Sequence, residues 1–411
     1  MLDINLIRNN PDQVKDGISK KGADSKLVDD FLTLDREWRE VTKETDELRA
    51  KQNELSAQRN IEEGKKVKAQ IQDLEATLKK LEENRSKILE QIPNLPAPDA
   101  PVGKDESANT VLREVGEKPK FNFKAKDHLE LGKTLDIIDF ETGSKVAGSG
   151  FYYLKNDGVL LELSLVRYAL DFLAKNGFTL WLTPDLAREK FYLGTGYSPR
   201  GEEAQTYTIE GTDLGLIATA EITLAGIHAD EILNEADLPK LYAGYSQCFR
   251  QEAGAYGKYS KGLYRLHQFT KVEMFAYTAP EDSPGMHEKL LELEEKLWQS
   301  LGVPYRVVEM CTGDLGAMAA KKFDLEAWMP GRDDWGEVTS TSNTTDYQAR
   351  RLGIKFRRKG GEVEFAHTLN GTAFATSRTI IAILENYQTK EGGVIIPEVL
   401  RDYVRKAEIE P

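Results

Sequence analysis

The sequence predicts an α+β protein: an antiparallel β-sheet flanked by helices, preceded by a long antiparallel hairpin of two helices. Residues 27–92 hold two apolar series with coiled-coil spacing. Prolines follow at 93, 96, 98 and 101. Beyond them, short strand-like runs alternate with helical patterns, without the regular βαβ order of a parallel sheet. We expect an N-terminal domain at 1–100, with its helical hairpin at about 27–92, and a second domain at 101–411.

Composition limits the classes of protein to consider. The chain has 411 residues, of which 30% are charged, and no apolar run approaches the ~18 residues that span a bilayer. The first ten residues lack the pattern of a signal peptide, and two cysteines cannot form a disulfide framework or a zinc-site spacing. We therefore expect a cytoplasmic protein with no membrane segment and no zinc. A net charge of −13 argues against nucleic-acid binding unless positive charge is concentrated locally.

In the N-terminal hairpin, apolar residues recur at alternating steps of four and three, with a few polar members. The first series is Leu27, Phe31, Leu34, Trp38, Val41, Leu48 and Leu55, with Thr45 and Gln52 as polar members. The second is Val67, Ile71, Leu74, Leu78, Leu81, Ile88 and Ile92, with Arg85 as its polar member. Residues 57–64 are the expected turn, and each helix of about 30 residues would be about 45 Å long.

Positive charge is concentrated around the expected turn. Between residues 49 and 68 there are six basic and three acidic residues. The basic ones are Arg49, Lys51, Arg59, Lys65, Lys66 and Lys68. Phosphate contacts need only local positive charge, so this segment could bind RNA by recognising the shape and the phosphate backbone of the RNA. The alternative is a coiled coil for protein–protein contact.

The second domain contains further periodic segments. We expect a strand at 158–163, a helix at 165–176, an amphipathic helix at 287–302 and a strand at 303–310.

The richest pattern is a pair of extended runs at 249–254 and 263–273. Side chains alternate in a strand, so Arg250 and Glu252 share one face of the first run. One face of the second run carries Arg265, His267, Phe269, Lys271 and Glu273. Two arginines, an aromatic ring and two carboxylates facing one pocket would suit a nucleotide beside a second, charged small ligand. The alternative is a surface hairpin with solvated charges.

Two other segments carry carboxylates that could meet ligands. In an extended chain Thr219 and Glu221 share a face, where a ligand ammonium could pair with the carboxylate; the alternative is an exposed edge residue. Residues 335–343 form a hydroxyl-rich strand in which Glu337 could hold Mg²⁺ together with nucleotide phosphates. Strict alternation separates Glu337 from Ser340, so contact of both with one ligand requires a bulge or a main-chain contact. The alternative is an ordinary strand.

Arg378 precedes an apolar helix predicted at 379–388. The helix dipole disfavours a cation there, so we expect a compensating anion such as a triphosphate. A local carboxylate is the alternative, but none lies within four residues. The common glycine-rich nucleotide loops are absent from the sequence.

Together these segments resemble the seryl-tRNA synthetase family of class II aminoacyl-tRNA synthetases. Residues 249–252 and 264–273 resemble motif 2 of that class, 177–184 motif 1, and 370–378 motif 3. Within the class, the resemblance to the seryl family rests on 219–221, 311–316, 336–343, 348–351 and 384–388, and on the N-terminal hairpin, which is that family's tRNA arm.

The resemblance implies roles for individual residues. Arg250 would meet the α-phosphate, Glu252 would read the adenine amino group, and Phe269 and Arg378 would sandwich the ring. Catalytic residues would be Arg250, Glu337 and Arg378. ATP would contact Arg250, Gln251, Glu252, Arg265, Phe269, Glu337, Val338, Thr339, Ser340 and Arg378. Serine would contact Thr219, Ala220, Glu221, Arg250, Glu273, Asn370 and Thr372, and Glu337 and Ser340 would hold Mg²⁺ with ATP.

The implied activity is that of a serine–tRNA ligase: formation of seryl-adenylate from L-serine and ATP, then transfer to tRNA(Ser), with tRNA(Sec) left open. Motif 1 implies a homodimer. Residues 257–261 carry lysines where many relatives have arginines, which puts the contacts of this loop with tRNA in doubt. Two alternatives stay open: a non-catalytic paralogue, and a ligase that loads a carrier protein, although such ligases lack the long arm.

Overall fold

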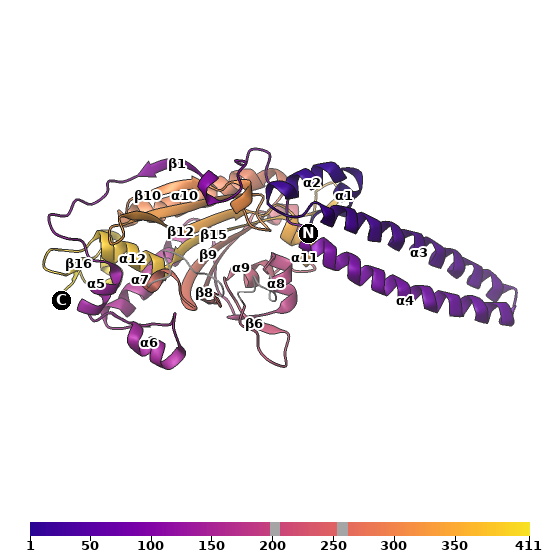
Figure 1. Cartoon of the computed structure of the whole chain (residues 1–411), viewed down its shortest axis with the longest axis horizontal. Coiled ribbons are helices and arrows are strands. Elements are labelled where there is room, and N and C mark those ends of the chain that lie inside the picture. Colours follow the sequence, from indigo (N-terminus) through magenta and orange to yellow (C-terminus); the bar gives the residue numbers. More distant parts are fainter. Residues whose placement is uncertain (198–205, 253–261) are drawn as a thin grey trace. The chain divides into compact units, whose positions relative to one another are not determined.

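A computed structural model describes residues 1–197, 206–252 and 262–411 (Figure 1). The chain divides into two compact units, Met1–Pro96 and Ala97–Pro411. None of the helices in the described parts of the chain has the length and apolar character needed to cross a bilayer.

The first unit is entirely helical. It consists of α1 (Ile4–Asn9), α2 (Pro11–Lys20), α3 (Lys26–Ala57) and α4 (Ile61–Gln91). Helices α3 and α4 lie side by side as the predicted antiparallel hairpin (Figure 1). The predicted turn was too long, because α4 already begins at Ile61. Asn60 caps it by accepting a hydrogen bond from the Glu63 main-chain N–H, so Gly64 lies inside the helix.

Between the two long helices lies a buried ionic cluster that the heptad pattern predicted only in part. Arg85, the polar member of the second series, is buried and donates to Asp35 at 2.9 Å. Asp35 is fully buried and also accepts from Arg8 at 2.7 Å, and the Arg85 guanidinium lies 4.1 Å from the Trp38 ring centroid. Asp35 was not predicted to be buried, because it lies between two positions of the apolar series, Leu34 and Trp38.

The second unit is built on an eight-stranded sheet that is antiparallel except at one edge. Its strands, in spatial order, are β1 (Thr110–Val115), β10 (Tyr305–Glu309), β11 (Lys321–Met329), β12 (Asp334–Asn343), β15 (His367–Ala375), β9 (Gln268–Thr278), β8 (Lys240–Phe249) and β4 (Thr179–Leu182). Among the described strands of this sheet, β4 alone pairs in parallel, with β8. Shorter strands form small separate sheets: β2 (Ile138–Asp139), β3 (Tyr153–Leu154), β5 (Leu186–Arg188), β6 (Leu214–Leu216), β7 (Ile232–Asn234), β13 (Lys355–Arg357), β14 (Val363–Phe365), β16 (Val394–Ile395) and β17 (Glu408–Ile409).

Helices of the second unit pack on this sheet and around its ends. They are α5 (His128–Thr134), α6 (Phe140–Ala147), α7 (Asp157–Lys175), α8 (Glu189–Thr195), α9 (Glu221–Ala225), α10 (Ser283–Leu301), α11 (Tyr347–Leu352), α12 (Thr376–Asn386) and α13 (Arg401–Val404). Helix α10 packs against β15 and β12, and its Leu290 and Trp298 are fully buried in the core. The predicted helix at 287–302 and the predicted strand at 303–310 are thus confirmed by α10 and β10.

The strand predicted at 158–163 is wrong, because α7 begins at Asp157 and runs without a break to Lys175. Its buried residues Leu161, Leu165, Ala169 and Leu173 recur every four positions, as on one face of a helix. A short apolar run such as 158–163 does not distinguish a strand from a helix by itself.

Candidate active site

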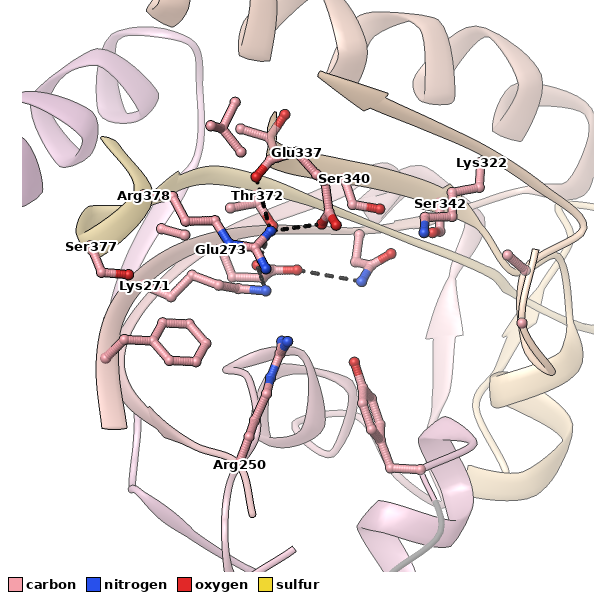
Figure 2. A pocket seen from close by; sticks show the side chains of 18 of the residues that line it. Arg250, Lys271, Glu273, Lys322, Glu337, Ser340, Ser342, Thr372, Ser377 and Arg378 are labelled. Atoms are coloured by element: carbon pink, nitrogen blue, oxygen red, sulfur yellow. Dashed lines mark hydrogen bonds and ion pairs between the residues drawn. The ribbon is translucent and has the colours of Figure 1, made fainter. Parts of the chain in front are cut away.

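A cavity of about 320 Å³ lies over the middle strands of the large sheet (Figure 2). Its walls come from β9, β11, β12 and β15, from the start of α12 and from the chain after β8. The charged residues around it are Arg250, Lys271, Lys322 and Arg378, with Glu252, Glu273, Asp314 and Glu337. In Figure 2, Arg250 reaches in from one side and faces Lys271, Glu273 and Arg378 across the open space.

The two runs predicted as extended differ in part from expectation. Strand β8 ends at Phe249 and β9 begins only at Gln268, since a 3₁₀ turn, η3, occupies Gly262–Tyr264. Phe269, Lys271 and Glu273 do line the cavity together, as their alternation predicted. His267 is absent from the residues lining the cavity and stacks instead on Phe151, with ring centroids 5.2 Å apart.

Of the two arrangements that would bring Glu337 and Ser340 to one ligand, β12 contains the bulge. Leu325 of β11 pairs with Thr339, but the next residue, Glu326, pairs with Glu337, so Val338 is the extra residue. A bulge reverses the alternation of side chains. Glu337 and Ser340 therefore both line the same cavity, together with the residues between them.

Arg378 has the compensating anion that its place in the helix predicted, but that anion is neither a ligand nor local in sequence. Helix α12 begins at Thr376, and the Arg378 Nη1 lies 3.0 Å from the Glu337 Oε1. Burial opposes ionisation of Glu337, yet Arg378, Lys322 and Arg250 hold its pKa below the usual range. The Tyr264 ring centroid lies 4.6 Å from the Arg378 guanidinium carbon, so an aromatic ring covers one side of this pair.

At the inner end of the cavity, a carboxylate sits among polar partners. Glu273 is fully buried, its Oε2 lies 2.5 Å from the Lys271 Nζ, and it accepts from Thr372 and Asn370 at 3.3 Å. Burial raises the pKa of Glu273 to about 7, although Lys271 acts in the opposite direction. The Oδ1 of Asn370 is buried with no partner among the residues described, and Asn370 lines the cavity.

Glu221 lies one step behind this wall. Its side chain accepts from Gln348 and Asn370 at 2.7 Å and from Tyr197 at 3.1 Å. Burial raises its pKa. The extended conformation expected for 219–221 is wrong: α9 begins at Glu221, whose main-chain N–H is bonded to the Thr219 hydroxyl at 3.3 Å.

The other residues singled out from the sequence are distributed unevenly. Those that line the cavity are Arg250, Glu252, Phe269, Glu273, Glu337, Val338, Thr339, Ser340, Asn370, Thr372 and Arg378. Gln251 turns away to the main-chain oxygen of Thr206 at 2.9 Å, and Arg265 pairs with Glu252 at 3.2 Å. Thr219, Ala220 and Glu221 are buried but absent from the lining. Residues 257–261 lie outside the described residues.

Several residues that line the cavity were not predicted from the sequence. In an extended run Tyr264 would lie on the face opposite Phe269, and the 3₁₀ turn that redirects it has only Gly262 as a signal. Tyr197, Met318 and Lys322 come from segments distant in sequence, and no local pattern marks them. Asp314 lies in 311–316, a segment that the resemblance singled out without giving this residue a role.

The basic residues near the tip of the α3–α4 hairpin are all exposed, but they are not equivalent. Arg49 bonds Glu75 of the opposite helix at 2.8 Å, whereas Lys65 and Lys66 approach carboxylates only at 3.7 and 3.8 Å. Lys51, Arg59 and Lys68 have no carboxylate within ion-pair distance in the described parts of the chain.

Comparison with protein families matches both units. Residues 1–96 match the model of the seryl-tRNA synthetase N-terminal domain, and residues 206–387 match that of the tRNA synthetase class II core domain (G, H, P, S and T). A serine–tRNA ligase of Dictyoglomus turgidum is 53% identical over all of both chains. The chain belongs to the seryl-tRNA synthetase family.

Further relatives agree with this assignment. A serine–tRNA ligase of Rubrobacter xylanophilus is 53% identical over 100% of this chain and 99% of its own. The crystal structure of seryl-tRNA synthetase from Pyrococcus horikoshii complexed with ATP has a TM-score of 0.94 and 44% identity, with each chain fully covered. The class II fold, with its long N-terminal helices, was therefore predicted correctly.

Proposed function

We propose that this chain is a serine–tRNA ligase that activates L-serine with ATP and transfers the seryl group to tRNA(Ser). One observation carries the proposal. A single cavity joins the Glu337–Ser340 bulge, two arginines and an aromatic ring to a buried carboxylate with amide and hydroxyl neighbours. The first group suits a nucleotide triphosphate, and the second suits a small polar amino acid.

For ATP, Arg250 would meet the α-phosphate from the side of the cavity that faces Arg378 (Figure 2). The Arg250 guanidinium carbon lies 5.2 Å from the Phe269 ring centroid. Adenine would be held between Phe269 and Arg378. Glu252 would read the adenine amino group. Arg265 would support Glu252 from behind, and Gln251 would act through the main chain, since its side chain is engaged elsewhere.

Mg²⁺ would arrive with the nucleotide. No group of three or more His, Cys, Asp or Glu side chains in residues 1–197, 206–252 and 262–411 is arranged to hold a metal ion. Glu337 and Ser340 offer a carboxylate and a hydroxyl oxygen on one wall, which are ligands that Mg²⁺ accepts when phosphate oxygens supply others. The ion would neutralise phosphate charge.

Serine would occupy the end of the cavity near Glu273. The Oδ1 of Asn370 is an acceptor without a partner among the described residues and would take an N–H of the serine ammonium. Glu273 and Thr372 would read the serine hydroxyl, which alanine lacks. Glu221, Thr219 and Ala220 would hold this wall from behind.

In the first step, a serine carboxylate oxygen would bond to the α-phosphorus as the bond to the β-phosphate bridging oxygen breaks, giving seryl-adenylate and pyrophosphate. The attacking carboxylate is ionised at neutral pH, so no general base is required. Positioning and charge neutralisation by Arg250 and Arg378 would therefore dominate catalysis. A terminal ribose hydroxyl of tRNA would then take the seryl group, releasing AMP.

The α3–α4 hairpin would bind tRNA. Lys51, Arg59 and Lys68 are exposed cations without carboxylate partners in the described parts of the chain, which leaves them available for phosphates. A cytoplasmic homodimer is also part of the proposal. The dimer is supported by an exposed apolar surface on α7 and β4, where Leu163 is 56% exposed and Leu182 is 78% exposed.

ATP–pyrophosphate exchange with each of the twenty amino acids tests the activation step. We expect serine alone to support rapid exchange. Aminoacylation with tRNA(Ser) and tRNA(Sec) transcripts would then define the acceptors. If none of the twenty amino acids supports exchange, the chain is a non-catalytic paralogue. If exchange depends on serine but the seryl group is transferred only to a carrier protein, the chain is a ligase that loads a carrier protein.

A further inference from the structure

A buried histidine–glutamate pair lies beside the cavity but outside its lining. His128, at the start of α5, and Glu385, near the end of α12, are 8% and 3% exposed. The His128 Nδ1 lies 2.9 Å from the Glu385 Oε1, which also accepts from the His128 main-chain N–H at 3.0 Å. The other oxygen, Oε2, accepts from the Gly331 main-chain N–H at 2.9 Å.

These contacts determine which ring nitrogen carries the proton. Glu385 presents acceptor oxygens, so the His128 Nδ1 must be the donor. In neutral imidazole, Nε2 is then an acceptor. It receives the main-chain N–H of Leu263 at 3.2 Å. The chain Glu385–His128–Leu263 is thus polarised in one direction, from the Leu263 amide toward the carboxylate.

The end of this chain is the 3₁₀ turn η3, which carries Tyr264 to the cavity. The Tyr264 main-chain oxygen accepts from the Arg378 Nε at 3.4 Å, and the Tyr264 ring lies against the Arg378 guanidinium. The same ring centroid lies 4.6 Å from the guanidinium carbon of Arg332, which follows Gly331 in the chain. Glu385 therefore holds both segments that meet at the Tyr264 ring.

The fit around His128 is close. An added Cβ at Gly262, which has φ +69°, would lie 2.1 Å from the His128 Nε2. The imidazole is packed directly on the backbone of η3, where only glycine leaves room. A small displacement of the ring would therefore move η3 and the Tyr264 side chain.

We infer that His128 and Glu385 are positioning residues for ATP, which hold η3 so that Tyr264 keeps Arg378 aimed into the cavity. The inference rests on the proposed function, because Arg378 is there an ATP ligand. Serine binding should depend on the pair much less, since Glu273, Asn370 and Thr372 lie on β9 and β15.

Three variants of His128 separate this role from simple packing. His128→Gln can keep an acceptor near the Nε2 position for the Leu263 N–H. His128→Asn can keep a donor to Glu385 but cannot reach Leu263, and His128→Phe loses both. The measurement is the KM for ATP and the KM for serine in pyrophosphate exchange, with the melting temperature of each variant.

We expect His128→Asn and His128→Phe to raise the KM for ATP about tenfold, the effect of one lost net hydrogen bond, with little change for serine. His128→Gln should restore most of the ATP affinity. The matched control is His228, which pairs with Glu231 and the Tyr242 hydroxyl, both at 2.8 Å, and lies outside the cavity lining. His228→Asn should not raise the KM for ATP relative to the KM for serine.

Equal rises in both KM values, or equal behaviour of the Gln and Asn variants, would overturn the inference. If His128→Asn does not fold, Glu385→Gln gives the same test. The glutamine amide nitrogen is a donor, so at least one of the hydrogen bonds that Glu385 now accepts from His128 or Gly331 must be lost. A wild-type protein without serine-dependent exchange would refute the proposed function instead, before any variant is compared.

Discussion

Asp35 of the helical unit and Glu273 of the sheet unit are both fully buried carboxylates, but their surroundings act on them in opposite ways. In the helical unit, Asp35 is surrounded by Arg8 and Arg85, which lower its pKa although burial opposes ionisation. In the sheet unit, burial raises the pKa of Glu273 to about 7, although Lys271 acts in the opposite direction. Asp35 has its counter-charges within its own unit, whereas the surroundings of Glu273 leave part of the cost of burial uncompensated.

The contrast separates a structural carboxylate from one placed for a ligand. Around Asp35 the partners come from α1 and α4, and the cluster ties these helices to α3. Around Glu273, Asn370 keeps an unused oxygen and faces a cavity. An incompletely satisfied polar site that opens to a cavity favours a function in binding.

The strongest test of the separation removes one region entirely. If α3 and α4 are replaced by a short linker, we expect serine-dependent pyrophosphate exchange to stay nearly unchanged and tRNA charging to fall to background. The reason is that no residue of the hairpin lines the cavity. Exchange and charging are measured on the same preparation. Charging at a comparable rate, or loss of exchange in a folded protein, would show that the two regions do not divide the work.

Within the sheet unit, Arg250→Ala should lower the rate of pyrophosphate exchange about a thousandfold, because charge develops on the α-phosphate that it would contact. Arg306→Ala is the matched control, since Arg306 pairs with Glu326 at 2.5 Å outside the cavity. Near wild-type exchange in the Arg250 variant would refute its assignment.

A second substitution in the sheet unit tests the role of Glu273. Glu273→Ala should lower serine activation about a hundredfold and affect alanine activation little, because only serine offers a hydroxyl to the lost partner. Thr372→Val should act in the same direction, and Glu326→Ala should change neither. Exchange rates with both amino acids provide the measurement, and equal losses for the two would place recognition of the hydroxyl elsewhere.

At the other carboxylate we expect an effect on stability and none on activation. Asp35→Asn should lower the free energy of unfolding of the helical unit by about 2 kcal/mol at pH 7, because buried Arg85 then keeps only the half-exposed Glu82 as its counter-ion. The folded-state pKa of Asp35 is lowered, so its stabilisation is present above the unfolded value of about 4 and is lost as pH falls below it.

The difference between wild type and Asp35→Asn should therefore shrink in acid. Helical circular dichroism during urea unfolding at several pH values measures it, with exposed Asp73→Asn as control. A difference that is constant from pH 7 to pH 3 would contradict the assigned role of the carboxylate charge.

Much of the site could be predicted from patterns that are local in sequence. Alternation brought Phe269, Lys271 and Glu273 to one wall. Contact of Glu337 and Ser340 with one ligand required a bulge or a main-chain contact, and β12 contains a bulge there. Prediction failed where the backbone changes conformation over a few residues. The expected strand begins only at Gln268, after a 3₁₀ turn at Gly262–Tyr264, so His267 and Tyr264 are redirected. At 219–221 a helix begins where an extended chain was expected.

The long helical hairpin, the extent of several helices and strands, and the family could all be read from the sequence, because they depend on periodicity and on residue types at fixed spacing. Which charges meet depends on the tertiary fold. Arg378 pairs with Glu337 and His128 pairs with Glu385, and the members of each pair are far apart in the chain. The Asp35–Arg85 contact likewise depends on the register between α3 and α4. The physical reason is that a buried charge is stable only beside a partner, and sheet pairing and helix packing select that partner from distant segments.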